Sequence, residues 1–116
     1  MPITIIPDSV HCNDLADDGP VARPLSQPPC RTSTLRVDLE GAGENRTGLW
    51  ECTPGSYERQ VAEAEVMHIL AGACVFTPKG GEPRHIKAGD TLFFPANTVG
   101  TWDIQETMRK VFVILK

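Results

Sequence analysis

The sequence lacks a strong charge of either sign, a long apolar run and a closely spaced cysteine pair. Among its 116 residues, 15 acidic and 11 basic side chains give a net charge of −4. The longest basic run is the dipeptide Arg109-Lys110, too short to attract a phosphate backbone or an anionic lipid surface. No apolar stretch approaches the ~20 residues of a membrane-spanning helix, and the N-terminus lacks the charged region of a signal peptide. We therefore predict a cytoplasmic protein that binds neither nucleic acid nor membranes.

The cysteines are few and widely spaced. Four of them stand at positions 12, 30, 52 and 74, with no Cys-x-x-Cys pair among them. This spacing argues against a zinc site and against a dithiol redox centre. The sequence also has no paired Cys and His signature that would lower the pKa of a nucleophilic thiol. We predict four free thiols, with Cys52 and Cys74 buried in strands as small hydrophobic residues.

Proline is concentrated near the N-terminus. Six of the ten prolines lie within the first 32 residues, mixed with aspartates. Proline lacks the amide hydrogen that a helix interior or a central strand needs. We therefore divide the chain into a Pro-rich extended arm over residues 1–32 and a folded domain over residues 33–116. Two interpretations of the arm stay open: an extended segment that crosses the surface of the domain or of a partner subunit, and a partly disordered leader.

From residue 32 onward, short segments rich in β-branched and aromatic residues alternate with turns rich in Gly, Pro, Asn and Asp. This spacing is typical of an all-β domain, and no segment has a sustained helical period. The predicted strands are 34–39, 47–52, 57–61, 65–70, 73–77, 85–87, 91–94, 99–104 and 108–115. Tight turns are expected at 78–82 and 88–90, where glycines allow positive φ. Many short strands in one domain predict a sandwich or a closed barrel, because closure removes exposed strand edges.

Three stretches of the sequence carry a resemblance to a known family. They are residues 48–55 (GLWECTPG), 65–72 (EVMHILAG) and 89–97 (GDTLFFPAN). In order and spacing they resemble the cupins, and most closely the small single-domain cupins of the DUF861 (Cupin_3) type, which are related to the cupin domain of (S)-ureidoglycine aminohydrolase. The resemblance covers about residues 46 to 115. It implies an RmlC-like jelly-roll β-barrel.

Cupins carry two motifs that place three histidines and one glutamate around a metal ion. The chain keeps the glutamate and a glycine of the first motif at Glu65 and Gly72, and the start of the second at Gly89 and Pro95. Asn97 replaces a turn glycine of the second motif, and Asn tolerates the left-handed backbone that such a turn needs. The histidine positions hold other residues: Arg59 and Val61, or Glu58 and Gln60 in a second register, and Gly100.

All three imidazole ligands of the family site are therefore missing, and we predict that the protein holds no metal ion and no other cofactor. Two alternatives stay open. A bulge would turn His68 to the same side as Glu65, or the oxygen atoms of Glu58, Gln60 and Glu65 would bind a hard cation weakly. The glycine at position 100 is expected to leave room for a ligand where the family has an imidazole.

A pocket without a metal ion is the site that we predict. The resemblance turns Glu65 into the barrel, where it acts as the catalytic or hydrogen-bonding carboxylate. Arg59 and Lys110 bind a small polar or anionic metabolite, and Tyr57 and Trp102 stack against it. The alternative is a buried ion-pair network of Glu65, Arg59 and Lys110, with Trp102 as ordinary core.

Three functions remain open at this stage, and the sequence does not decide whether the protein is an enzyme. The first is a metal-free cupin that binds a small metabolite. The second is a hydrolase similar to (S)-ureidoglycine aminohydrolase, which acts on a ureido or carboxylate compound with a remodelled metal site. The third is a structural dimerisation unit. Val66 and Leu70 form an outward apolar pair with His68 between them, and this pair predicts a homodimer. Trp50 is interpreted as core.

Overall fold

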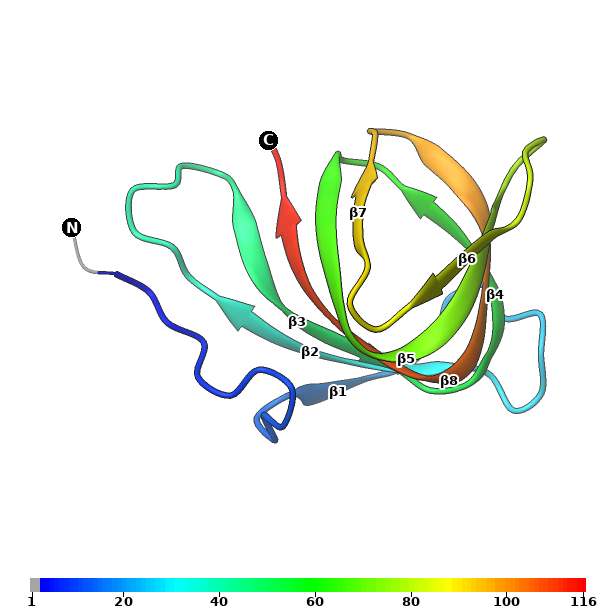
Figure 1. The fold of residues 1–116 in the computed structure, drawn as a ribbon, viewed down its shortest axis with the longest axis horizontal. Helices are drawn as coiled ribbons and strands as arrows, with labels where there is room; N and C mark the ends of the chain where they lie inside the picture. Colours follow the sequence, from blue (N-terminus) through cyan, green and yellow to red (C-terminus); the bar gives the residue numbers. More distant parts are fainter. Residues whose placement is uncertain (1–2) are drawn as a thin grey trace.

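The computed structural model describes residues 3–116, which form strands and loops and no helix (Figure 1). Its strands are β1 (Ala16–Pro20), β2 (Arg31–Val37), β3 (Arg46–Cys52), β4 (Gly55–Val61), β5 (Glu65–Pro78), β6 (Arg84–Lys87), β7 (Thr91–Phe94) and β8 (Thr98–Ile114). The all-β prediction is confirmed. The described part of the chain has no helix that could cross a membrane. Residues 1 and 2 of the predicted arm lie outside the described residues.

All strands pair antiparallel in one sheet that curls on itself. Along its main path the order is β1-β2-β3-β8-β5-β6, while β4 pairs with β8 and β7 pairs with β5. Strands β5 and β8 have 14 and 17 residues, long enough for each to pair with three neighbours. In Figure 1 these two strands curve around one end of the molecule as a barrel, and β1, β2 and β3 extend beside it. We call these three strands the wing.

Strands β5 and β8 each replace two predicted strands. The sequence predicted interruptions at 71–72 and 105–107, but each strand continues through them. Gly72 has a φ of 91°, and the register between β5 and β8 shifts on both sides of it. The glycine therefore makes a bulge that bends the strand without ending it. The backbone of Glu106 and Thr107 packs so closely against it that no side chain fits. The predicted set of strands is wrong at these two points for this reason.

Side-chain alternation gives the sheet an inner and an outer face. On β5, Glu65, Met67 and Ile69 are buried, whereas Val66 and His68 between them are half-buried. Strand geometry alone explains the pattern, because successive side chains point to opposite faces. The predicted inward orientation of Glu65 is therefore observed.

An aromatic cluster fills the barrel end of the inner face. Phe76 of β5, Phe94 of β7 and Trp102 of β8 bring their ring centroids to within 4.7 to 5.6 Å of one another. All three side chains are buried. Edge and offset contacts of this kind add to the stabilisation that burial of the rings provides.

Both predicted turns and the left-handed asparagine are present. Residues 78–82 close the hairpin between β5 and β6, with a hydrogen bond from Gly81 N to Pro78 O at 2.9 Å. Residues 88–90 lead from β6 to β7, and Asp90 N donates to Lys87 O at 3.1 Å. Asn97, just before β8, has a φ of 62°.

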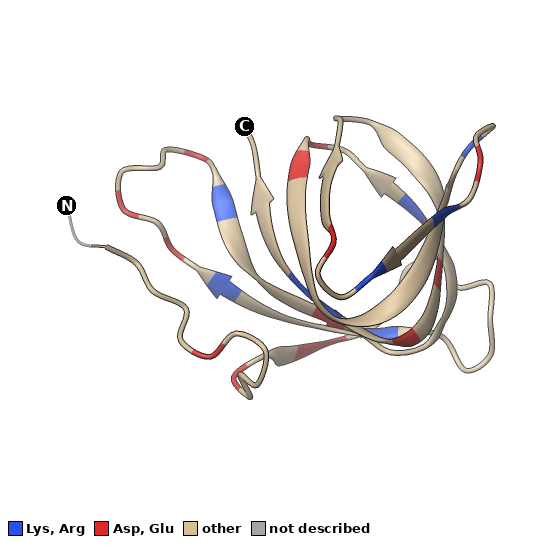
Figure 2. Ribbon diagram, viewed as in Figure 1, with Lys and Arg blue, Asp and Glu red and all other residues tan. Residues whose placement is uncertain are grey.

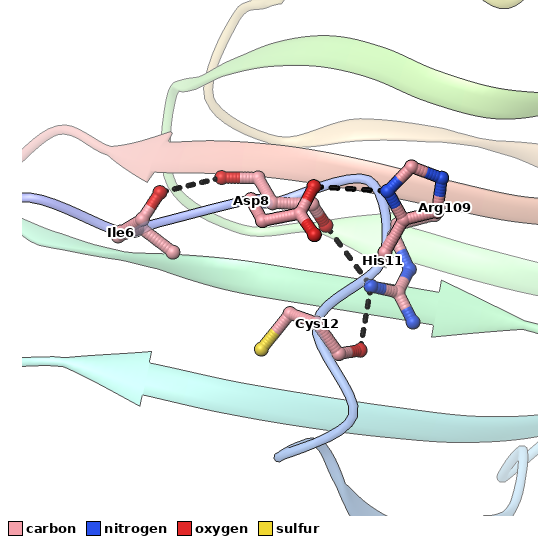
Figure 3. Close-up of polar contacts among 6 residues, drawn as sticks. Ile6, Asp8, His11, Cys12 and Arg109 are labelled. Carbon is pink, nitrogen blue, oxygen red and sulfur yellow. Dashed lines mark hydrogen bonds and ion pairs between the residues drawn. The ribbon is translucent and has the colours of Figure 1, made fainter.

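The stretch before β1 lies against the outer face of the sheet, where Arg109 of β8 holds it. The Arg109 guanidinium donates hydrogen bonds to the main-chain carbonyls of Ser9 at 2.9 Å and Cys12 at 2.8 Å (Figure 3). It also pairs with the Glu51 carboxylate of β3 at 2.6 Å. In this structure residues 3–15 therefore cross the surface of their own domain.

The rest of the predicted arm contributes to the sheet and to the barrel wall. β1 is an edge strand paired with β2, and its only proline, Pro20, is its last residue. The following loop runs along β4, where Leu25 N donates to Ser56 O and Glu58 N to Arg23 O. Residues 16–20 thus extend the wing and the loop after them packs against β4 of the barrel, and a domain boundary at residue 32 stays a prediction.

Candidate functional site

A cavity of about 520 Å³ lies between the wing and the barrel. Strands β2, β3, β4, β5 and β8 line it, together with residues 20–22 of the chain after β1. Charged residues of both signs are spread over the strands and loops of the molecule as a whole (Figure 2). The cavity lining likewise holds both signs, with four basic residues (Arg36, Arg46, Arg59 and Lys110) and three acidic ones (Asp38, Glu58 and Glu65), of which Glu65 and Lys110 are buried.

Lys110 and Glu65 form a buried ion pair in the wall of this cavity. Lys110 Nζ donates a hydrogen bond to Glu65 Oε2 at 2.8 Å, and the two side chains are 10% and 6% exposed. Lys110 lies opposite Ile69 in the register of β5 and β8, so its side chain extends along the inner face to reach Glu65. The Nζ atom also lies 3.4 Å from Met67 Sδ. The same Nζ lies 4.6 Å from the ring centroid of Trp50.

Burial is the main influence on the Lys110 ammonium. It lowers the pKa of Lys110 below the ordinary value of 10.5, while the Glu65 carboxylate acts in the opposite direction through its charge and its hydrogen bond. The positive charge of Arg59 lowers the pKa further. The neutral amine is therefore easier to form on Lys110 than on an exposed lysine.

Arg59 and Tyr57 belong to β4 and differ in exposure. Arg59 is exposed at the cavity edge and has no ion-pair partner among residues 3–116. Tyr57 is 4% exposed, and burial raises the pKa of its phenol well above 10.0. All five residues predicted for the site, Tyr57, Arg59, Glu65, Trp102 and Lys110, line the same cavity. Their roles stay predictions, and the predicted three-residue ion-pair network is reduced to the Glu65–Lys110 pair.

Both tryptophans line the cavity, and they differ in burial and in neighbours. Trp102 is buried in the aromatic cluster with Phe76 and Phe94. Trp50 of β3 lines the cavity, is only partly buried and lies under the Lys110 ammonium. The sequence missed Trp50 because the pairing of Trp50 with Lys110 across β3 and β8 is a register that one sequence does not specify. Trp50 is therefore a further aromatic surface of the cavity, and it is more exposed than Trp102.

The residues around Glu65 do not fit the metal site that the cupin resemblance implies. Such a site needs three neutral imidazoles and a carboxylate that converge on one point. Here the Glu65 carboxylate accepts a hydrogen bond from Lys110, and the nearby wall offers a guanidinium. At position 100, a side chain would meet the Phe76 ring and the Thr77 carbonyl. The expectation that Gly100 leaves room for a ligand is wrong, because Phe76 fills that space.

The two alternative metal sites are also not assembled. His68 projects from the outer face and its Nδ1 lies 2.7 Å from the Thr91 hydroxyl. Glu58 and Gln60 are both exposed on β4, and of the two only Glu58 lines the cavity. Within residues 3–116 no three His, Cys, Asp or Glu side chains lie close enough to hold a metal ion.

The cysteines offer no nucleophile. All four are free, as predicted, and Cys30, Cys52 and Cys74 are buried. Burial raises the pKa of Cys74 to about 11 and raises that of Cys30 and Cys52 as well. Thiols with raised pKa values stay protonated near neutral pH and are poor nucleophiles.

The cavity therefore combines three chemical abilities. Arg59 and Arg36 offer positive charge to an anion, Trp50 offers an aromatic face, and the Lys110–Glu65 pair can donate and accept a proton at one point. Charged donors in a partly closed cavity bind oxygen anions more strongly than they do in water. The arrangement suits a small ligand with a negative charge at one end.

Comparison with known proteins identifies the family. The family profile described as the EutQ-like cupin domain (Cupin_3) matches residues 39–112, which include both motifs quoted above. This match confirms the predicted cupin of the DUF861 type, and it does not test the relation to (S)-ureidoglycine aminohydrolase. No curated protein matches the sequence.

Solved structures agree on the fold. A Pseudomonas syringae protein of unknown function from the DUF861 family superposes with a TM-score of 0.76 and 22% identity, over 87% of this chain and 44% of that one. This chain thus spans less than half of that relative. The Clostridium difficile EutQ protein gives 0.65 and 16% over 79% and 75% of the two chains. The Schizosaccharomyces pombe Cnp3 cupin domain gives 0.61 and 12% over 73% and 64%.

Proposed function

Because the chain belongs to the family of EutQ-like cupin domains, we propose that it binds a small anionic metabolite in the cavity between wing and barrel. The ligand's charged group lies near Arg59 and Arg36 at the cavity edge, and its other end lies beside Trp50 and Lys110. In this proposal the protein acts without a metal ion, since the residues around Glu65 suit an ion pair and not a metal.

The observation that carries the proposal is that two arginines, Arg36 and Arg59, line the cavity without an ion-pair partner among the described residues. The chain as a whole has a net charge of −4, yet four basic residues line the cavity against the acidic Asp38, Glu58 and Glu65. Arg46 and Lys110 pair with Glu63 and Glu65, whereas Arg36 and Arg59 have no such partner among residues 3–116. Side chains without a charge partner that face a cavity are typical of ligand sites with a few convergent polar groups. Glu65 is the group that accepts a proton or hydrogen bond from the ligand.

The second function predicted from the sequence, hydrolysis of a ureido or carboxylate compound with a divalent ion, has less support. Its metal would need ligands beside Glu65, and the described residues supply an ammonium and a guanidinium at that place. Binding of ureido compounds is included in the test below, because a hydrolase would have to bind them first.

Binding is tested by isothermal titration calorimetry and thermal unfolding with small mono- and dicarboxylates and ureido compounds. We expect a carboxylate to stabilise the protein, by about 2.7 kcal/mol at one hundred times its Kd. Arg59→Ala is expected to weaken binding about tenfold or more, because a charge-assisted hydrogen bond is lost. Arg84→Ala is the matched control, since Arg84 is also exposed on a strand but lies outside this cavity. Equal affinity of the Arg59→Ala variant and the wild type would contradict the site.

We also propose that the protein is a cytoplasmic homodimer. Four free thiols in a small domain support a reducing compartment. The half-buried outer face around Val66 and His68 supports self-association.

A further inference from the structure

We propose that Lys110 forms an imine with an aldehyde or ketone group of the bound metabolite, so that the ligand class is a small oxo acid. This inference rests on the proposed function, which supplies an anionic ligand in the same cavity. It adds a covalent step at one named atom, the Nζ of Lys110.

Geometry places this one lysine where a bound carbonyl carbon can reach it. Lys110 is the only lysine that lines the cavity of the described chain. Its side chain keeps 10% of its surface exposed, so part of this side chain borders the cavity, and its Nζ lies beside the Trp50 ring, which also lines the cavity. The remaining lysines, Lys79, Lys87 and Lys116, lie on the exposed surface.

The groups around Lys110 favour the neutral amine that imine formation needs. Burial lowers its pKa, and Arg59 on β4 acts in the same direction. Glu65 on β5 opposes this change, but its Oε2 lies 2.8 Å from Nζ and is placed to take the proton. From β3, the Trp50 ring lies against the ammonium and Cys52 favours the charged form slightly. A desolvated lysine beside a base is the usual arrangement for an amine that attacks carbonyl groups.

The step balances without a further reactant. Glu65 takes a proton from the Lys110 ammonium, and the amine nitrogen attacks the carbonyl carbon as the carbon–oxygen π electrons move to oxygen. After proton transfer from nitrogen to oxygen gives the neutral carbinolamine, the protonated Glu65 donates to its hydroxyl group. The carbon–oxygen bond breaks, water leaves, and the protonated imine pairs with the Glu65 carboxylate. No electrons are exchanged. The carboxylate of the oxo acid meanwhile pairs with Arg59 or Arg36 across the cavity.

Reductive trapping tests the imine on the wild-type protein. The protein is incubated with pyruvate or glyoxylate and sodium cyanoborohydride, which delivers hydride to an imine and makes the link permanent. Intact mass and peptide mapping then locate the adduct. We expect one adduct per chain at Lys110, with more labelling there than at any exposed lysine, because a lowered pKa gives a larger neutral fraction of the amine. Lactate has a hydroxyl group in place of the ketone or aldehyde group. It therefore gives no adduct and serves as the reagent control.

Two variants separate the specific reaction from surface chemistry. Lys110→Arg keeps a positive charge beside Glu65 and is expected to abolish the adduct. Lys87→Arg is the matched control, because Lys87 also pairs with a carboxylate, Asp90 at 3.5 Å, but is 76% exposed. This control variant is expected to label like the wild type. Equal labelling of all lysines, or an unchanged adduct in Lys110→Arg, would overturn the inference.

Failure of the inference is distinguishable from failure of the proposed function. Calorimetry without the reductant measures reversible binding of pyruvate, glyoxylate and lactate. If these acids bind with an Arg59-dependent affinity and no adduct forms at Lys110, the imine is overturned and anion binding stands. If an adduct forms at Lys110 but Arg59→Ala neither weakens binding nor slows trapping, the amine reacts as we infer and the proposed role of Arg59 fails.

Discussion

At the scale of single residues, the Glu65–Lys110 pair sets the chemistry of the cavity. The Lys110 ammonium and the Glu65 carboxylate lie 2.8 Å apart and are almost fully buried. Burial removes water from both charges, and the attraction between them offsets this cost. The pair therefore serves a ligand in two ways. It keeps a lysine in an apolar wall, and it keeps a carboxylate at hydrogen-bond distance from that lysine.

Removal of one partner of this pair should destabilise the protein strongly. Glu65→Gln leaves a buried ammonium without its counter-charge, and Lys110→Met leaves a buried carboxylate, so each variant is expected to lose about 3–5 kcal/mol. The double variant Glu65→Met, Lys110→Met should recover most of this loss, because both charges are replaced by apolar side chains of similar size. Urea unfolding of the four proteins gives the interaction energy. Single-variant losses below about 1 kcal/mol would show that the pair is solvated.

The sequence could predict the direction of these side chains, but it left open whether they form an ion-pair network or a ligand pocket. The resemblance and strand alternation placed Glu65 and Lys110 inward, as observed. They did not predict that Lys110 would bond to Glu65 while Arg59 stays free, because this depends on the register of β5, β8 and β4. The same limit applies at position 100, where the missing imidazole suggested a space that the Phe76 ring fills.

At the scale of elements, β5 and β8 hold the molecule together. Each bends once and pairs with neighbours on both sides of the bend, so wing and barrel share the same two strands. The sequence predicted nearly all the turns, since these depend on local glycine, proline and asparagine chemistry. It failed at 71–72, where the Gly72 bulge resembles a turn locally, and at 105–107, the part of β8 that packs against this bulge. Whether a bulge or a turn forms is decided by a distant strand.

The N-terminal stretch depends on Arg109, which bonds it to the outer face of the sheet. Arg109→Ala removes the donors to Ser9 and Cys12 and should raise hydrogen exchange in residues 3–15 about tenfold or more, because bonds from a charged donor contribute about 1.5–3 kcal/mol. Mass spectrometry of the N-terminal peptides measures the effect. Arg84→Ala, which lies on β6, should leave exchange in these peptides unchanged. If both variants behave alike, Arg109 does not hold the stretch.

At the scale of the whole molecule, the sheet has two faces with different tasks. The inner face contains the cavity and its charged residues. The outer face carries an apolar row across three neighbouring strands: Phe93 of β7 and Val113 of β8 both lie opposite Val66 of β5. Phe93 is 60% exposed. A small domain with one modest core gains stability when such a row is covered by a second copy.

The proposed homodimer makes this row the interface. Sedimentation equilibrium is expected to give twice the chain mass of 12.7 kDa. Phe93→Ser should raise the dissociation constant about tenfold to a hundredfold, since burial of a phenylalanine contributes about 1.5–3 kcal/mol. Val99→Ser is the control: Val99 is 43% exposed, lies on a separate part of β8 paired with β4, and should leave the association unchanged. A dimer of wild-type strength in Phe93→Ser would move the interface elsewhere, and a monomer at all concentrations would show that the row stays exposed to water.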